Sequence, residues 1–565
     1  HQRQRLGRRA DPDQAEAEGV PVLPGLNDPG ADDAALIAAA PGIGFPLMVK
    51  ARAGGGGRGM RRVDAAQALP EALRLARGEA ATAFGDDALI LERALDGARH
   101  VEVQVLADAH GAVLTLGERD CSAQRRRQKV LEEAPAPGLS QAARAALAEA
   151  ARRLTRAGGY VNAGTAEFLV SPGGEAFFLE MNARLQVEHP VTEAVTGLDL
   201  VALQLRVAAG RPLGLSQEDV RLHGHAVEAR LCAEDPAAGF LPSAGPILGW
   251  RMPTGEGLRV DAGYAEGAEV PAVYDSLLAK VVAWGETREI ALARLTAALA
   301  RTAVLGPRSN AAFLREAAGH RDFAAGGVAT TWLEAALPAP VDAPASEAEA
   351  AMAAALVLEA AAASAAAAGG LRAELRGWSS DAGLASRLTL GAGEARFEFS
   401  ARPIPGGWRV AGEAAHEIVV EAAAAGRARL RCGGETVEAL WTCDGEAARL
   451  ALGPRQLSFA VLSAGGAAAE AGADGRVEAP MHGRLVSLEA AEGDAVAKGD
   501  LLAVLEAMKM QHRLTAPVAG RVARIHRRPG DQTAAGDPIL DIEPDPDPDP
   551  DPDDSSNDTQ TEAAP

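Results

Sequence analysis

The chain has 565 residues, too many for one hydrophobic core, so we expect several domains. With 47% hydrophobic and 24% charged residues it is typical of a soluble globular protein, and a formal net charge of −21 argues against a nucleic acid or an anionic membrane surface as partner. The four cysteines are far apart and no signal peptide is present, which favours a reducing cytoplasm.

The first three fifths of the chain predict mixed α/β structure. Residues 1–19 are polar and arginine-rich, without a strand pattern. Over 20–95, apolar runs alternate with helical stretches as in a small α/β unit, and the mixture continues on a larger scale over 96–335. After a linker rich in proline, alanine and acids, residues 351–368 are the nearest approach to a membrane-spanning run. Their alanine content predicts a helix in water instead.

The last part of the chain predicts β structure. Residues 345–463 are expected to form this helix followed by a β-rich domain. Within 474–543, residues 479–506 align without gaps on 516–543, with ten identities in 28 pairs. Two equivalent halves predict a small pseudo-twofold β-sandwich whose linker, 507–515, is an exposed hairpin. The tail 544–565 alternates proline with aspartate and should be disordered.

Lysine is rare in this chain, since only five of the 56 basic residues are lysine. One of them, Lys509, lies in the predicted hairpin within "EAMKM". This motif, with "APM" upstream, resembles the biotinyl domain of biotin-dependent carboxylases, in which the lysine between methionines carries biotin. A lipoyl domain has the same fold, but its Asp-Lys-Ala context is absent. The remaining alternative is a plain β-sandwich with a surface lysine.

A glycine run follows a predicted strand in "MVKARAGGGGRGM", residues 48–60. Consecutive glycines let backbone N–H groups wrap a phosphate, although such a run is as often a flexible loop. With Lys50 at the strand end, the motif resembles the ATP-grasp loop of biotin carboxylase. The resemblance implies that the nucleotide is contacted by Lys50 and by Gly54, Gly55, Gly56 and Gly57.

A predicted hairpin at 166–182 brings acids together. If Gly173-Gly174 is a two-residue turn, Glu167 stands directly opposite Glu180. Facing carboxylates repel unless a cation lies between them. Polar and apolar residues then alternate as far as Glu188, which predicts an extended segment with one polar side. The alternative is an amphipathic edge strand with a solvated face.

The segment "EMNARLQVEHPVTE" also resembles the biotin carboxylase signature. The resemblance implies a magnesium or manganese site that binds with ATP, made by Glu167, Glu180 and Asn182. It implies that Glu188 is the base that deprotonates bicarbonate. Bicarbonate and biotin would be held by Arg184, Gln186 and Val187.

A basic run occurs in "GERDCSAQRRRQKVLEEAPAP", residues 117–137. A nucleic-acid patch is one interpretation, which the acidic net charge disfavours. The run resembles a biotin carboxylase segment, which implies that Gln124 lies near the ribose and Lys129 near bicarbonate or phosphate. Arg127 stands where that family usually has histidine or asparagine, so its role stays open.

Three further residues match positions of the same family. Glu92 and His100 correspond to nucleotide-site residues, although an isolated His100 would more often be a core histidine. Arg259 corresponds to an arginine near the carboxylated biotin, and by itself would be an exposed strand residue.

Taken together, the chain resembles an acyl-CoA carboxylase α subunit with an α+β multidomain fold. The resemblance implies an ATP-grasp biotin carboxylase core with a lid subdomain (20–95) and a C-terminal subdomain (96–335). It further implies a β-rich subunit-docking linker domain (345–463) and a biotinyl β-sandwich, or barrel-sandwich hybrid (474–543).

This resemblance implies a ligase that uses ATP and bicarbonate to carboxylate biotin on Lys509 and delivers carboxybiotin to a separate carboxyltransferase β subunit. The acyl-CoA is expected to be 3-methylcrotonyl-CoA or geranyl-CoA, with propionyl-CoA or acetyl-CoA next. A biotin protein ligase would attach the biotin. We expect a cytoplasmic hetero-oligomer without nucleic-acid or membrane partners, and a single-chain pyruvate carboxylase is disfavoured.

The family begins with a further nucleotide-binding α/β domain, of which residues 1–19 would be a remnant. The chain is therefore expected to lack the N-terminal biotin carboxylase subdomain. The rival hypothesis is a truncated, biotinylated carrier and scaffold subunit without carboxylase activity of its own.

Overall fold

The computed structural model describes residues 12–28, 30–52, 60–338, 343–369, 384–424, 426–462, 475–507, 510–534 and 536–544. Lys509, the four glycines at 54–57 and the acidic tail from 545 lie outside the described residues. The chain forms two compact units. The smaller comprises Leu241–Gly245, Glu269–Ser276 and Ser463–Pro565, and the larger comprises the rest of the chain.

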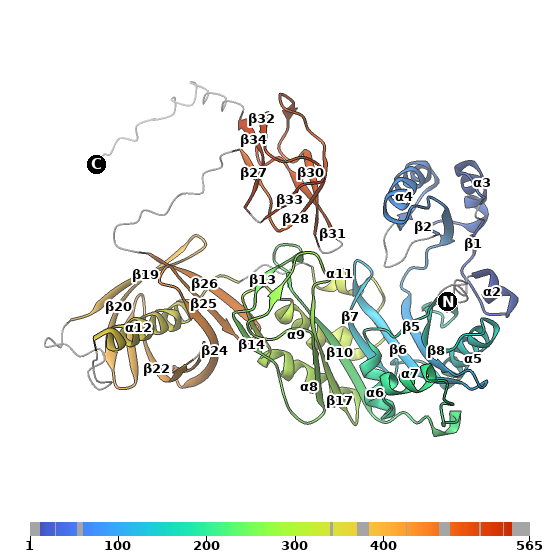
Figure 1. Cartoon of the computed structure of the whole chain (residues 1–565), viewed down its shortest axis with the longest axis horizontal. Helices are drawn as coiled ribbons and strands as arrows, with labels where there is room; N and C mark the ends of the chain where they lie inside the picture. Colours follow the sequence, from blue (N-terminus) through green and yellow to red (C-terminus); the bar gives the residue numbers. More distant parts are fainter. Residues whose placement is uncertain are drawn as a thin grey trace, which may run out of the picture. The chain divides into compact units, whose positions relative to one another are not determined.

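A four-stranded antiparallel sheet comes first in the larger unit (Figure 1). Helices α3 and α4 pack on one of its faces through Leu36 and Leu73, against Leu47 and Val49 of the sheet. Lys50 lies on the opposite face, because side chains alternate along a strand. In sheet order the strands are β1 (Gly25–Leu26), β4 (Leu89–Arg93), β2 (Leu47–Ala51) and β3 (Arg61–Val63), and the helices are α3 (Asp33–Ile43) and α4 (Leu69–Phe84).

An eight-stranded antiparallel sheet follows. Its order is β15 (Leu258–Ala262), β17 (Leu277–Gly285), β10 (His225–Cys232), β7 (Gln128–Ala134), β6 (Val113–Arg125), β5 (Arg99–Ala107), β8 (Asn162–Val170) and β9 (Ala176–Asn182). Further helices are α2 (Pro12–Ala17), α5 (Gln141–Ala157), α6 (His189–Thr196), α7 (Leu200–Ala208), α8 (Arg288–Arg301) and α9 (Ala311–Gly319).

Helices cover both faces of this sheet. Helix α5 packs on the face that carries Val101 and Val103. Helix α6 packs on the opposite face, against Ala134 and Ala226. The strand register places Glu102 on the α6 face, because its antiparallel partner Arg119 lies in the same row as these alanines.

The hairpin of β8 and β9 has the predicted acid pair but not the predicted turn. Val170 stands opposite Ala176, so the connection is longer than the two residues Gly173-Gly174. A β-bulge between Glu167 and Phe168 then shifts the register by one residue, and Glu167 stands opposite Glu180 as expected. The longer turn shifts the predicted register by one residue, and the bulge shifts it back.

The extended segment predicted through Glu188 is wrong. Strand β9 ends at Asn182, and beyond it Ala183 is exposed while Gln186 and Glu188 are both buried. The chain turns into α6, which has a proline in its first turn and Glu188 at the N-cap. A helix therefore starts where the alternation predicted a continuing strand.

A closed barrel of eight antiparallel strands surrounds helix α12 (Glu347–Gly369), as Figure 1 shows. The strands are β19 (Ser386–Ala392), β20 (Ala395–Ile404), β21 (Gly407–Ala411), β22 (Ala415–Ala424), β23 (Arg427–Cys432), β24 (Glu435–Cys443), β25 (Ala447–Leu452) and β26 (Arg455–Leu462). Leu440 and Ala451 of the barrel pack against Ala303 and Leu305 of the preceding region.

By length and composition alone, α12 could cross a membrane, contrary to the expectation from the sequence. Its N-terminal half is instead enclosed by the barrel. Residues 350–355 and Leu356 are buried against side chains such as Leu390, Val410 and Phe459 from the strands. The apolar character of this half of α12 is explained by its place in the barrel core.

Leu356→Ala should therefore lower the free energy of unfolding by about 2–5 kcal/mol, because it leaves a cavity in a closed core. Leu358→Ala on the same helix is the matched control, because Leu358 is only partly buried. Urea unfolding of the full chain measures both. Equal losses for the two variants would contradict the enclosed position of Leu356.

The C-terminal repeat folds as two matching four-stranded sheets, in the orders β27-β34-β32-β29 and β31-β30-β28-β33. The strands are β27 (Arg476–Glu478), β28 (Gly483–Leu488), β29 (Ala495–Val496), β30 (Leu501–Ala507), β31 (Met510–Thr515), β32 (Gly520–Ile525), β33 (Gln532–Thr533) and β34 (Pro538–Pro544). The linker between the copies lies in the hairpin of β30 and β31, as predicted, but most of it is strand β31, in which Leu514 is buried. The pair Ala507–Met510 closes the connection from β30.

The repeated glycines and aspartates turn the chain in the same way in both halves. Gly493 and Gly530 have positive φ angles of 92° and 101°. In each case the following aspartate accepts a hydrogen bond at 2.8 Å from the backbone N–H three residues before it. Gly499 and Gly536 share the positive φ. Glycine is favoured at these positions because it adopts positive φ without strain.

Candidate functional site

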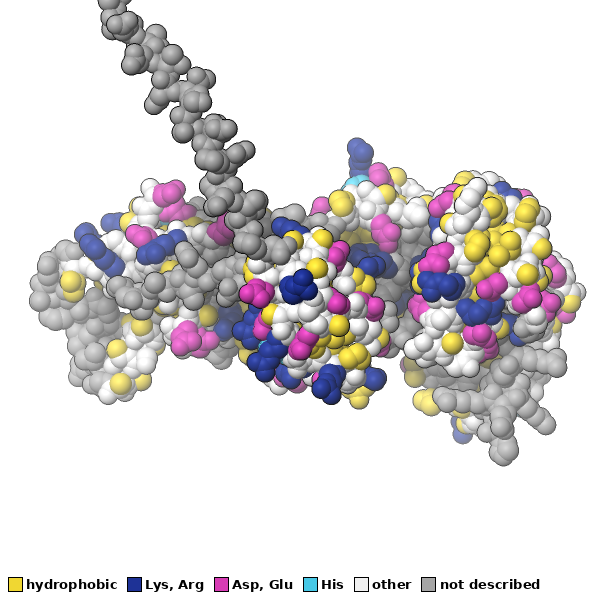
Figure 2. Space-filling view, turned by 90° about the horizontal axis from the view of Figure 1, so that it is seen from above, with side chains coloured by type: hydrophobic (Ala, Val, Ile, Leu, Met, Phe, Trp, Pro, Cys, Tyr) yellow, Lys and Arg dark blue, Asp and Glu magenta, His cyan; other side chains and the backbone are white. Residues whose placement is uncertain are grey.

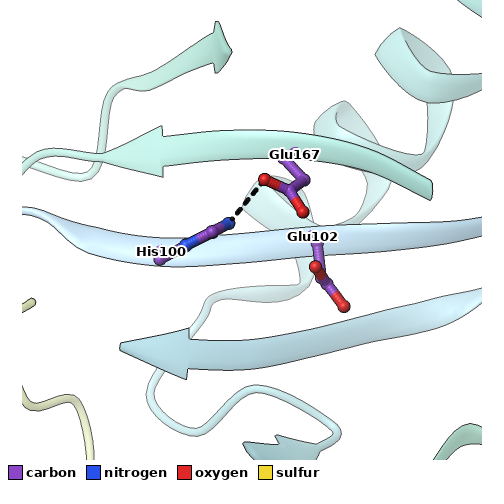
Figure 3. Close-up of side chains that lie close together, drawn as sticks. All are labelled: His100, Glu102 and Glu167. Carbon is purple, nitrogen blue, oxygen red and sulfur yellow. Dashed lines mark ion pairs between the residues drawn. The ribbon is translucent and has the colours of Figure 1, made fainter. Parts of the chain in front are cut away.

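Buried acids gather on the α6 face of the eight-stranded sheet (Figure 3). Glu102 on β5 and Glu167 on β8 are direct cross-strand partners. His100 Nε2 lies 3.1 Å from Glu167 Oε2. One ligand atom from each of His100, Glu102 and Glu167 lies within 4.8 Å of the others. Such a group needs positive charge nearby to remain buried.

Lys129 supplies that charge. Its Nζ donates hydrogen bonds to Glu102 Oε2 at 2.6 Å, Glu167 Oε1 at 3.1 Å and Glu188 Oε1 at 2.6 Å. Burial lowers the pKa of Lys129, but the negative charges of Glu102, Glu188 and Glu167 around it raise it well above its ordinary value. An ammonium thus lies between Glu102 and Glu167, which disfavours a metal ion at that point.

Arg119 completes the neutralisation of Glu102. It is fully buried and donates from Nε to Glu102, and its Nη1 reaches Gln104 and Thr192. Burial alone would raise the pKa of Glu102, but the charges of Arg119 and Lys129 bring it down to about 2. Glu102 therefore stays a carboxylate at neutral pH.

Glu188 is fully buried and is held by two cations. Lys129 binds its Oε1, and Arg230 Nη2 donates to its Oε2 at 2.8 Å. Gln186, two residues earlier, donates from Nε2 to Glu167 Oε1 at 2.7 Å. The structure thus brings together five of the residues singled out from the sequence: His100, Lys129, Glu167, Gln186 and Glu188.

Val187 and Arg259 adjoin this cluster through a lysine that the sequence left without a role. Lys280 Nζ donates to the Val187 carbonyl oxygen at 3.1 Å and lies 3.2 Å from Asp261 Oδ2. Arg259 is partly exposed, binds Asp261 through Nε and Nη2, and reaches Glu193 of α6 at 2.6 Å. A chain of polar contacts therefore runs from Arg259 to the backbone beside Glu188.

Other predicted residues lie outside the cluster. Lys50 and Glu92 form an ion pair with each other within the four-stranded sheet. Gln124 is buried beside Lys129, its strand partner. Arg184 is exposed, and its guanidinium donates only to the neighbouring carbonyl of residue 185 among the described residues.

Arg127 connects two parts of the larger unit. It has a positive φ of 65°, in the turn between β6 and β7. Its Nη1 donates to the Met60 carbonyl oxygen at 3.2 Å, just before β3 and just after the glycine run. Arg127 thus contacts the backbone next to the predicted phosphate loop.

The predicted metal ligands suit a hard divalent cation. Glu167 and Glu180 are cross-strand partners, and Asn182 Nδ2 lies 3.3 Å from Glu180 Oε1. Within the part of the chain that the structure describes, no cation pairs with Glu180. Two carboxylates and an amide oxygen on neighbouring strand positions match the preference of Mg²⁺ and Mn²⁺ for oxygen ligands. The uncompensated Glu180 carboxylate favours a cation here.

Sequence reasoning missed four residues of the site: Glu102, Arg119, Arg230 and Lys280. A signal was present, because Glu102 in "RHVEVQV" and both Glu228 and Arg230 in "HAVEAR" are charged residues at alternate positions of apolar strands. Charge at a period of two inside a buried strand indicates side chains that neutralise one another.

On the surface shown in Figure 2, acidic and basic side chains are interspersed over much of the view, and several basic side chains gather along one edge of the domain at its centre.

Comparisons with known proteins find matches in three regions of the chain. Residues 8–216 match the family model "Carbamoyl-phosphate synthase L chain, ATP binding domain", 228–335 match "Biotin carboxylase C-terminal domain", and 475–542 match "Biotin-requiring enzyme". Biotin carboxylase 2 of Bacillus subtilis is 46% identical over 319 residues, which are 56% of this chain and 72% of that protein. The α subunit of mouse mitochondrial methylcrotonoyl-CoA carboxylase is 48% identical over 318 residues, which are 56% of this chain but only 44% of that protein.

Solved structures show the same likeness. A biotin carboxylase complex from Campylobacter jejuni has 41% identity and a TM-score of 0.56, covering 57% of this chain and 72% of that one. The biotin carboxylase domain of Hydrogenobacter thermophilus 2-oxoglutarate carboxylase, solved with ADP, magnesium and bicarbonate, has 40% identity and a TM-score of 0.56, covering 57% and 71%.

Proposed function

Because the chain belongs to the biotin carboxylase family, we propose that it uses ATP and bicarbonate to carboxylate biotin, with the biotin attached at Lys509. The observation that carries the proposal is Glu188, a fully buried carboxylate held between Lys129 and Arg230. Because two cations fix its carboxylate, Glu188 would face a bound anion in a single orientation, as a general base must.

Glu188 would take the proton of bicarbonate. Lys129 and Arg230 would hold Glu188 in place and attract the anion, because their charges act in a site from which water is largely excluded. Arg184, which is exposed at the start of this loop, is free to form a bidentate contact with a small planar anion. Gln186 and the Val187 backbone would complete the bicarbonate and biotin contacts, and Arg259 would approach biotin from β15.

The nucleotide would bind between the two sheets of the larger unit. Lys50, the glycines at 54–57, Glu92, His100 and Gln124 are its proposed contacts. Glu167, Glu180 and Asn182 would hold Mg²⁺ or Mn²⁺, which when bound would screen the charge of the phosphates. Arg127 would join the backbone after the glycine run to the core, as its bond to Met60 suggests.

The biotin group, when attached, would supply the nitrogen that accepts the carboxyl group. We propose the acyl acceptor and the partner from the resemblance to the relatives. The similarity to methylcrotonoyl-CoA carboxylase α subunits favours 3-methylcrotonyl-CoA, with geranyl-CoA, propionyl-CoA and acetyl-CoA as alternatives. The barrel with α12 would dock a separate carboxyltransferase β subunit, in a cytoplasmic hetero-oligomer.

The experiment is to follow ATP-dependent incorporation of labelled bicarbonate into free biotin by the full chain. We expect incorporation that requires both ATP and a divalent cation. The control variant Lys509→Arg should keep this activity and lose reactivity with avidin after co-expression with a biotin protein ligase. Avidin reactivity of the wild-type chain without any carboxylation would contradict the proposal and support the carrier and scaffold hypothesis.

A further inference from the structure

A second pair of acids lies beneath the start of α6. Glu228 on β10 stands directly opposite Glu132 on β7, so their side chains share one face of the sheet. Both residues are fully buried, at 0% exposure. Val191 of α6 and Val282 of β17 belong to the apolar cluster that covers this part of the sheet. Two carboxyl groups are therefore enclosed side by side without access to water.

One guanidinium binds two of the three acids in this region. Arg230 donates from Nε to Glu132 Oε1 and from Nη2 to Glu188 Oε2. The other nearby cation, Lys280, is engaged by the Val187 carbonyl and Asp261. Among the residues that the structure describes, no group donates a hydrogen bond to either oxygen of Glu228 or to Glu132 Oε2. Three buried oxygen atoms thus have no donor.

A proton on Glu228 explains these three atoms. A buried carboxylate without a donor is strongly disfavoured, whereas a protonated one is itself a donor. The O–H of Glu228 would bond to Oε2 of Glu132, the acceptor on its cross-strand partner. Burial raises the pKa of Glu228 well above its ordinary value, and the charge of Glu132 adds to the shift. Burial also raises the pKa of Glu132, to about 7.

We propose that Glu132 and Glu228 share one proton, and that the presence of this proton determines how strongly Arg230 interacts with Glu132 relative to Glu188. The inference rests on the proposed function, since Glu188 is the base in that proposal. With the proton, the pair carries one negative charge. When the proton leaves to solvent at higher pH, the pair carries two charges and attracts Arg230 more strongly. Glu188 then loses part of a cationic partner and accepts a proton from bicarbonate more readily.

The charged surroundings leave the pair as the group that titrates near neutral pH. Its neighbours are Lys129 on β7, Arg230 on β10, Lys280 on β17, Glu188 at the start of α6 and Cys121 on β6. The pKa of Arg230 is raised despite its burial, because Glu132, Glu188 and Glu228 surround it, so it stays charged. Burial raises the pKa of the Cys121 thiol, which stays neutral.

The stability of the full chain tests the shared proton. The folded pair holds a proton that the unfolded chain releases above its ordinary pKa, so wild-type stability should fall as the pH rises from about 5 to about 8. In Glu228→Gln the amide N–H can donate to Glu132 at every pH. This variant should therefore lose the part of the decrease in stability that comes from the shared proton. Glu132→Gln should behave in the same way, whereas the exposed control Glu398→Gln should keep the wild-type slope. Unchanged slopes in both variants of the pair would overturn the shared proton.

The link to Glu188 has two tests. At saturating bicarbonate, kcat for carboxylation of free biotin should rise several-fold with pH in the wild type, and Glu228→Gln should lose this rise while keeping the KM for ATP. A double-mutant cycle of Glu188→Gln with Glu228→Gln, measured by unfolding, should show a coupling that changes with pH. A retained rise of kcat, or no coupling, would overturn the role of Arg230. An inactive wild-type chain would contradict the proposed function, while the slopes and the cycle would still decide this inference.

Discussion

Glu188→Gln is expected to lower kcat for ATP-dependent carboxylation of free biotin by about 10²–10⁴-fold, the range that loss of a positioned general base produces. Glutamine has nearly the same shape, but its single amide oxygen can accept a hydrogen bond from only one of Lys129 and Arg230, and it cannot take a proton. The fold should survive, so the thermal transition and ATP binding should remain close to those of the wild type. Steady-state kinetics with labelled bicarbonate provides the measurement.

Glu398→Gln is the matched control for this variant. Glu398 lies on the barrel, where its only described ion pair is with Arg396 at the surface. The control should keep full activity. A Glu188→Gln protein that retained activity within a few-fold of the wild type would remove Glu188 from the mechanism and leave the buried cluster with a structural role.

Arg119→Met is expected to cost about 3–5 kcal/mol in the free energy of unfolding, because it removes a cation from a buried acid and leaves that charge partly uncompensated. Arg119 is 0% exposed and its partner Glu102 is equally buried. Only Lys129 would remain as a cation on Glu102, and Gln104 and Thr192 would lose their hydrogen-bond donor. Urea unfolding of the larger unit at neutral pH measures the loss.

The pH dependence of this loss has a definite sign. The folded pKa of Glu102 is about 2, below its ordinary value of 4.5, so its charged contacts contribute stability above pH 4.5 that is lost as the pH falls toward 2. The difference between wild type and Arg119→Met should therefore shrink over this window. Arg431→Met, which breaks an exposed pair with Glu421, should change little at any pH. A difference that grew with acid would refute the role given to Glu102.

The repeat in the C-terminal domain could be predicted from the sequence because each half carries the same turns. Glycines with positive φ followed by an aspartate occur at equivalent positions, and strands β28, β29 and β30 recur as β32, β33 and β34. The strand equivalent to β27 in the second copy was missed. It is β31, which was predicted to be a linker because its apolar residues do not alternate clearly.

The acid site could be predicted only in part. The motif around Glu167, Glu180 and Glu188 was visible in the sequence, but the groups that neutralise these acids come from strands far apart in the chain. Arg119 and Arg230 reach Glu102 and Glu188 only through the register of the eight-stranded sheet. No local pattern fixes such pairings, and a single bulge between Glu167 and Phe168 is enough to change them.

The closed barrel has a consequence for recognition. Strand β19 pairs with both β20 and β26, so the sheet closes on itself and none of its eight described strands is an edge strand. A protein that docks here cannot extend the sheet with a strand of its own, as many peptide ligands do. Contacts with a partner must instead come from side chains and connecting loops. Specificity for one partner can therefore change through loop substitutions while the barrel itself is preserved.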